Sequence, residues 1–209
     1  MESVTLKPFD YIRAGLRHAK FQIATIGVTY LLFVGIGSIM VHESNSFALN
    51  YRDKLVTRAV NSDPASIAFH QGNNLTAAIF DFGENLFLGA IPQTITGLTI
   101  ISPYGFAAYR GWVGGVVTVD SNHQSRFASF KGGFYLILTL ILQLIPYTLA
   151  GGIGVKLGLT YFRSYPEYLN QKKWLGYPAG CLEEVAWVYV LIVPLFFIAS
   201  LWEFLSTWN

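Results

Sequence analysis

The residues most able to do chemistry in this sequence are polar side chains embedded in a long apolar stretch, residues 73–119. On a helix that turns by about 100° per residue, Asn74, Asp81 and Asn85 fall within about 40° of one another, and Glu84 lies at the flank of this face. A carboxylate at the centre of a bilayer costs roughly 2.5 to 3.5 kcal/mol on insertion scales. These acids must therefore face protein, water or a positive charge, where they could hold a proton or an ion.

Two later residues extend this group. Arg110, in the next apolar segment, is the expected counter-charge for Asp81 or Glu84, and Gln143 lies in a later apolar run. If Arg110 pairs with an acid, the group is a structural clasp between two helices; if water reaches it, it lines a pathway. The sequence leaves both open. We call this set the intramembrane polar cluster: Asn74, Asp81, Glu84, Asn85, Arg110 and Gln143.

Composition points to a single integral membrane domain covering residues 1–209. Of the 209 residues, 53% are hydrophobic and only 12% are charged, which leaves little for a separate soluble domain. A net charge of +2 without a basic, aromatic-rich stretch excludes a nucleic-acid partner. The lone Cys181 and the isolated histidines lack metal-ligand spacing, and no hydrolase, metalloprotease or phosphate-binding motif occurs. We therefore expect no enzyme, no cofactor and no metal site.

The hydropathy pattern predicts an all-α, polytopic helical membrane protein with about five transmembrane helices. Pro92 should kink or break the central helix near Ile91, because proline removes a backbone donor. Residues 42–72 should form an extramembrane loop, with a short helix at about 47–60. The third segment is short and could be re-entrant. The expected membrane segments are 21–41, 73–101, 104–119, 133–160 and 185–205.

Residues 6–20 are expected to form an N-terminal interfacial amphipathic helix. Arg13, Arg17 and Lys20 recur on one face, where they suit anionic lipid headgroups, although a solvated entry helix is the alternative. With five spans, the N-terminal segment and the 161–181 loop carry seven Lys or Arg, against five in the opposing loops. This bias places the N-terminus in the cytoplasm.

The fourth segment contains a series of small residues. Gly151, Gly154 and Gly158 are candidates for close helix packing, and Gly154 and Gly158 have the four-residue spacing typical of membrane helix contacts. Lys156 lies near the end of the segment, so its side chain is expected to extend to the membrane interface.

The run from Ala150 to Gly158, with its glycines around a basic residue, resembles the signature of the stage II sporulation protein M family of integral membrane proteins. The resemblance covers about residues 70 to 206. Three further pieces agree in order: Asn73-Asn74 before an apolar helix, the glycine-rich turn and short helix from Gly105 to Gly115, and Val193-Pro194-Leu195 leading to Glu203-Phe204.

The resemblance has two departures. Gln143 stands where the family's intramembrane glutamate is expected, and Tyr104 replaces an asparagine before the turn glycine. The resemblance thus implies that a proton- or cation-binding role of that glutamate, where relatives have one, is absent or moved here. The family's namesake is a membrane anchor and scaffold that recruits cell-wall hydrolases, which implies a bacterial or archaeal cytoplasmic membrane.

Two functions follow. The first is a non-catalytic integral membrane scaffold or accessory subunit, docking other membrane proteins or a second copy through its glycine faces, the 42–72 loop and its aromatic interfaces. The alternative is an oligomeric transporter or channel for a small solute or ion that uses the intramembrane polar cluster. In both, the lipid bilayer is a partner.

Overall fold

The computed structural model describes residues 8–163 and 165–208, and its architecture is helical apart from one two-stranded hairpin. Residues 6 and 7 of the expected interfacial helix lie outside this part. In chain order the elements are α1 Pro8–His18, α2 Lys20–His42, α3 Ser46–Ser62, α4 Pro64–His70, α5 Asn74–Gly83, the π-helix η1 Glu84–Ala90, α6 Ile91–Thr96, the 3₁₀ turn η2 Gly97–Thr99, α7 Ser102–Val116, the 3₁₀ turn η3 Arg126–Ala128, α8 Phe130–Phe162, the 3₁₀ turn η4 Pro166–Tyr168, β1 Lys173–Trp174, β2 Tyr177–Pro178 and α9 Ala179–Leu205.

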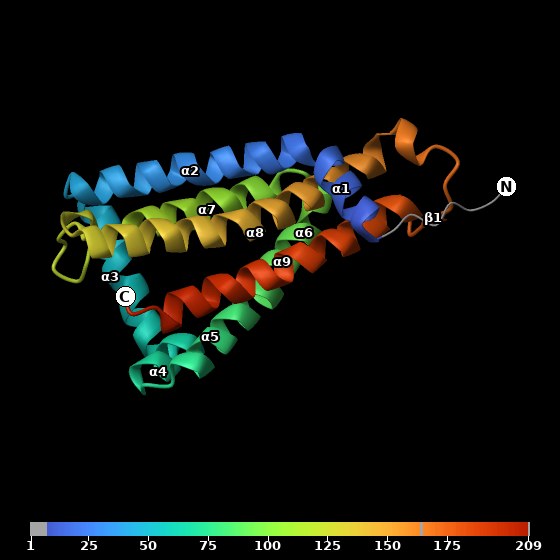
Figure 1. Ribbon diagram of the computed structural model, residues 1–209. Coiled ribbons are helices and arrows are strands. Elements are labelled where there is room, and N and C mark those ends of the chain that lie inside the picture. The colour runs from blue at the N-terminus through green and yellow to red at the C-terminus, as the bar shows by residue number, and fades with distance from the viewer. Residues whose placement is uncertain (1–7, 164, 209) are drawn as a thin grey trace.

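The helices form two arms that meet near α1 and α6 and diverge toward α3 and α4 (Figure 1). Helices α2, α7 and α8 pack side by side in one arm, whereas α9 and α5 pack together in the other. Helix α3 runs from the end of α2 across the open side to α4 (Figure 1). Within the described residues, three helices are long and apolar enough to cross a membrane: α2, α8 and α9.

The 42–72 segment is more helical than expected: α3 confirms the predicted short helix at about 47–60, and α4 is an additional helix of this segment. Two helices fill it, and polar caps define where each begins. The side chain of Asn45 accepts a hydrogen bond from the Ala48 amide (3.1 Å) at the start of α3, and Asp63 accepts one from the Ser66 amide (2.7 Å) at the start of α4. Pro64 then occupies the first turn of α4, where its missing N–H has no intrahelical role.

The α-helical hydrogen-bond pattern of the central segment is interrupted before Pro92. The chain stays helical there, but it widens into a π-helical turn. The helical path runs from Asn74 to Thr96, and the π-helix η1 ends at Ala90, immediately before α6. Pro92 sits in the first turn of α6. A proline cannot donate to the preceding turn and its ring crowds the carbonyl four residues back, and a π-helical turn gives that backbone more room.

Glycines bring α2 and α7 into backbone contact. A Cβ on Gly37 would collide with the Trp112 carbonyl, and one on Gly111 would collide with the Tyr30 carbonyl. Lipid-embedded helices gain little from the hydrophobic effect, so close backbone approach and van der Waals packing hold them together. Gly35, two residues from Gly37 on the same helix, has open space around it.

These two glycines make a matched pair for testing the α2–α7 contact. Gly37→Ala should lower the free energy of unfolding by about 1–3 kcal/mol, because the added methyl meets backbone that cannot rotate away. Gly35→Ala should leave stability unchanged or raise it slightly, since alanine favours helix. Thermal unfolding of the purified variants, followed by circular dichroism, measures both. Equal effects of the two substitutions would contradict the contact.

Candidate functional site

A cavity of about 1030 Å³ lies between the two arms. Its walls come from α2, α3, α4, α7, α8 and α9, together with the turn at η3. Much of the lining is apolar, but polar and charged side chains enter it from several elements. They include His70, Arg110, Arg126, Tyr135, Gln143, Tyr147 and Glu203.

Asp81 joins three helices through hydrogen bonds. Its Oδ2 accepts from Ser200 Oγ of α9 at 2.6 Å and from Asn85 Nδ2, one turn along its own helical path, at 2.9 Å. The Tyr147 hydroxyl of α8 donates to Asn85 Oδ1. Asp81 is therefore satisfied by neutral donors and ties α5 to α9 directly and to α8 through Asn85.

A second polar contact joins α8 to α9 one turn away. Gln143 Nε2 donates to Glu203 Oε2 at 2.6 Å, and the Tyr135 hydroxyl donates to the Glu203 backbone carbonyl at 2.8 Å. Gln143 and Tyr147 are four residues apart on α8, so they share a face. The Gln143–Glu203 pair therefore lies beside the Asp81 group, and Gln143, Tyr147 and Glu203 form the polar part of the cavity wall here.

Arg110 forms no ion pair with Asp81 or Glu84 in the described structure, so its expected role as their counter-charge in a clasp is wrong. Its guanidinium carbon lies 3.9 Å from the centroid of the Tyr147 ring. Gly89 lies against both Arg110 and Tyr147, because a Cβ there would be 2.8 Å from Arg110 Nη2. Arg110 is thus a half-buried cation placed on an aromatic ring at the cavity wall.

The other members of the intramembrane polar cluster lie elsewhere. Asn74 is the exposed first residue of α5 and makes no contact with the cavity wall. Glu84 is half-buried and interacts with Asp63, at the start of α4, as well as with Asp81. The fold thus brings together Asp81, Asn85, Arg110 and Gln143 near the Tyr147 face of α8, whereas Asn74 is separate and Glu84 reaches the group only through its interaction with Asp81.

Sequence reasoning missed the residues that complete the site. Tyr147 and Ser200 are ordinary members of apolar helices, and only their position along α8 and α9 gives them a role. In the sequence, Glu203 stands out only as part of the last piece of the family resemblance, near the end of the last predicted span. Its four-residue distance from Ala199 and its place on the same helical face as Ser200 were the available signals that it faces inward.

Lys156 is buried and not at the interface, so the expectation for it is wrong. The residue is 2% exposed, and its Nζ donates to Glu184 Oε2 at 2.5 Å and to the Tyr168 hydroxyl. The Tyr168 hydroxyl donates to the same carboxylate oxygen at 2.8 Å, and His18 Nδ1 lies 3.1 Å from Glu184. We call Lys156, Glu184, Tyr168 and His18 the buried ion cluster; it joins α1, α8, α9 and η4.

Two neighbouring glutamates test the buried ion cluster. Glu184→Gln should lower the free energy of unfolding by about 3–5 kcal/mol, because it leaves the Lys156 ammonium buried without a negative partner. Glu183→Gln, at the exposed adjacent position, should change it by less than about 1 kcal/mol. Thermal unfolding in the same detergent measures both. If the Glu184→Gln variant unfolds at the same temperature as the wild type, the fold does not need the Glu184 charge to keep Lys156 buried.

The three packing glycines of α8 are covered inside the chain. Gly151 lies against the Gln93 side chain, Gly154 against the Thr94 backbone and Gly158 against the Gly97 carbonyl. Gln93 is 1% exposed and its amide has no hydrogen-bond partner within the described part of the chain.

The lipid-facing candidates Arg13, Arg17 and Lys20 are exposed on α1 and the start of α2.

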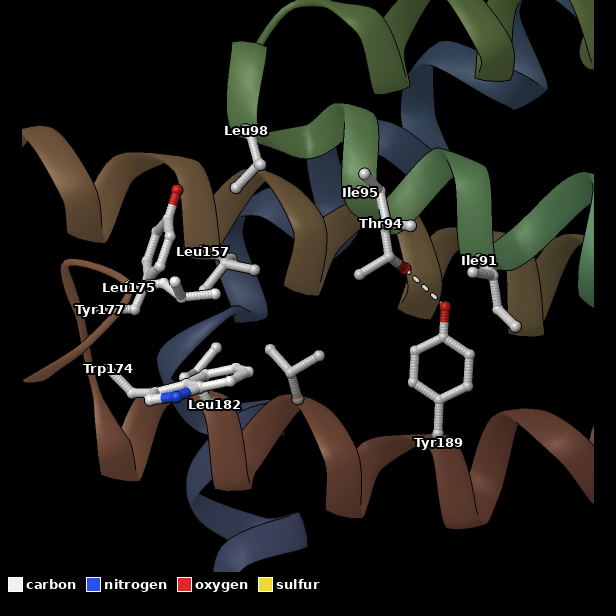
Figure 2. Close-up of a pocket in the computed structure, with 11 residues that line it drawn as sticks. Ile91, Thr94, Ile95, Leu98, Leu157, Trp174, Leu175, Tyr177, Leu182 and Tyr189 are labelled. Atoms are coloured by element: carbon white, nitrogen blue, oxygen red, sulfur yellow. Dashed lines mark hydrogen bonds between the residues drawn. The ribbon is translucent and has the colours of Figure 1, made fainter.

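A second, apolar pocket of about 420 Å³ lies between α6, α8, α9 and the β1–β2 hairpin (Figure 2). Thr94 and Tyr189 line the pocket beside α6, and both side chains carry a hydroxyl group. The Thr94 hydroxyl donates to the Ala150 carbonyl at 2.9 Å and accepts from the Tyr189 hydroxyl at 2.8 Å. The two hydroxyl groups are already hydrogen-bonded, to each other and to the Ala150 carbonyl. This pocket therefore offers a ligand mainly apolar contact.

Neither a metal site nor a known relative explains the cavity. Over residues 8–163 and 165–208, no group of three or more His, Cys, Asp or Glu side chains could hold a metal ion. Comparison with models of protein families, with curated proteins and with solved structures finds no match to this chain.

Proposed function

We propose that this chain is a multi-pass membrane protein that admits a small solute into the cavity between its arms, as a transporter or the solute-binding subunit of one. The observation that carries the proposal is the cavity itself: about 1030 Å³ with a charged and hydrogen-bonding wall at mid-helix depth. Charged side chains within membrane segments are costly, and they commonly mark substrate or ion paths.

Five membrane crossings account for the arrangement of the segments. Helix α2, the α5–α6 path, α7, α8 and α9 each run between the same two ends of the molecule, in alternating direction (Figure 1). Helix α7 has 15 residues and rises about 22 Å, which is short for a hydrocarbon core of roughly 30 Å. Val117, Thr118 and Val119 follow it and extend the crossing. Exposed Leu31, Leu32 and Ile39 on α2 suit contact with lipid.

The crossing of α7 is tested by cysteines at its two ends. In a Cys181→Ser background, Ile101→Cys and Asn122→Cys should react with a membrane-impermeant maleimide from opposite sides of the membrane. Asn61→Cys, at the end of α3, is the control and should share the side of Asn122. Labelling of positions 101 and 122 from one side would make α7 re-entrant and reduce the crossings to four.

The scaffold hypothesis has less support in the structure. Gly151, Gly154 and Gly158 pack against α6 and η2, so this glycine face is occupied within the chain and cannot dock a partner. The stage II sporulation protein M resemblance stays a prediction. In that resemblance Gln143 stands at the position of a glutamate, and here Gln143 bonds Glu203, so we infer that the acidic role moved to α9.

Water access to the cavity decides between transport and a sealed structural void. Val113 lines the cavity, whereas Val28 is exposed on the outer face of α2. In the Cys181→Ser background, a water-soluble maleimide should modify the Val113→Cys variant in intact membranes and leave Val28→Cys, which should face lipid, unmodified. An unreactive Val113→Cys variant that reacts only after denaturation would overturn the proposal.

For the location, we propose the cytoplasmic membrane of a bacterium or archaeon, with α1 on the cytoplasmic side. The exposed Arg13, Arg17 and Lys20 support this orientation, because cytoplasmic segments carry an excess of Lys and Arg.

A further inference from the structure

We infer that the cavity selects an amphiphilic anion: an oxyanion head bound by Arg110 and an apolar body held by the surrounding walls. This inference rests on the proposed function, because it needs a cavity that solutes enter. It names the chemical class of the solute, which the proposed function leaves open.

The charges that face the cavity leave Arg110 without a partner. Among the other charged residues of the lining, Arg126 attracts Glu203, and Glu203 also accepts a hydrogen bond from Gln143. Arg110 makes no hydrogen bond or ion pair with any residue that the structure describes. Asp81 attracts it at a distance, but the Asp81 carboxylate is engaged by Ser200 and Asn85.

The position of Arg110 suits it to bind a ligand. Its guanidinium lies over the Tyr147 ring, 3.9 Å from guanidinium carbon to ring centroid, with Gly89 packed against Nη2. This contact with the ring uses none of the guanidinium N–H groups as hydrogen-bond donors, and they make no hydrogen bond within the described residues. A planar fork of free donors at a cavity wall matches a carboxylate or phosphate group, which it can bind through two parallel hydrogen bonds.

The rest of the lining requires an apolar body on the same ligand. On the arm that carries Arg110, the apolar part of the wall includes Val113, Leu136 and Leu140, beside the polar side chains of Tyr135 and Gln143. A small hydrophilic anion would leave these surfaces against water, whereas an apolar body would cover them. An anion with an aromatic or alkyl tail therefore satisfies both the cation and its surroundings.

Three probes with one apolar body separate charge from apolar contact: 4-phenylbutyrate, 4-phenylbutylamine and 4-phenyl-1-butanol. Binding of radiolabelled probes to the full-length protein in lipid nanodiscs, corrected for empty nanodiscs, gives each affinity. The protein should bind phenylbutyrate at least ten-fold more tightly than phenylbutylamine. Equal or tighter binding of the amine would overturn the inference without any variant, because the acids and not Arg110 would then set the selectivity.

The variant Arg110→Gln should weaken phenylbutyrate binding by about ten-fold or more and change phenylbutanol binding by less than about two-fold. The control Arg58→Gln removes an exposed cation of α3 that does not line the cavity, and it should change neither. If Arg110→Gln keeps the anion affinity, Arg110 is not the anion site and the inference fails.

Failure of this inference is distinguishable from failure of the proposed function. If the Val113→Cys variant is modified by maleimide but phenylbutyrate is not preferred, the cavity is open and only the ligand class is wrong. If Val113→Cys is unreactive and none of the three probes binds, the cavity is closed and both proposals fail.

Discussion

Close backbone contact between helices is the constraint on which the rest of the structure depends. Gly37 and Gly111 bring α2 onto α7, and Gly154 and Gly158 bring α8 onto α6 and η2. In a bilayer, apolar side chains gain little by leaving lipid for protein, so helices associate where small residues let their backbones meet. The contacts of the α8 glycines with α6 and η2 lie where the two arms meet, and from there the arms diverge toward α3 and α4 and enclose the cavity (Figure 1).

Helix α8 combines three tasks along its length. Its first half carries Gln143 and Tyr147, which form the polar wall of the cavity. Its middle carries the glycines that receive α6. Near its end Lys156 enters the buried ion cluster. Lys156 lies between Gly154 and Gly158, so the glycine contact and the buried ion cluster share the second half of α8, whereas the cavity is lined by α8 residues from Gly132 to Tyr147.

Hydropathy predicted the positions of the helical segments well. The length of an apolar run and the position of a proline affect only the helix in which they occur, so both can be read from the local sequence. The α8 and α9 segments extend a few residues beyond their predicted limits, and the interruption before Pro92 lies where it was expected. The charge partners were not predictable in this way. Lys156 and Glu184 are 28 residues apart, and nothing in either local sequence shows that α1, α8 and α9 converge there. Arg110 was assigned to the acids because attraction was the only available criterion, and stacking on Tyr147 depends on how α7 packs beside α8.

The π-helix η1 between α5 and α6 sets how far α6 is rotated relative to α5 about the axis of this helical segment. A π-helical turn takes up one residue more than an α-helical turn, and one residue corresponds to a rotation of about 100° about the helix axis. The half after it is fixed by the glycines of α8, whereas the half before it directs Asp81 to Ser200. The extra residue thus lets one continuous segment meet two differently oriented surfaces, and shortening η1 to an α-helical turn would swing Asp81 away from α9.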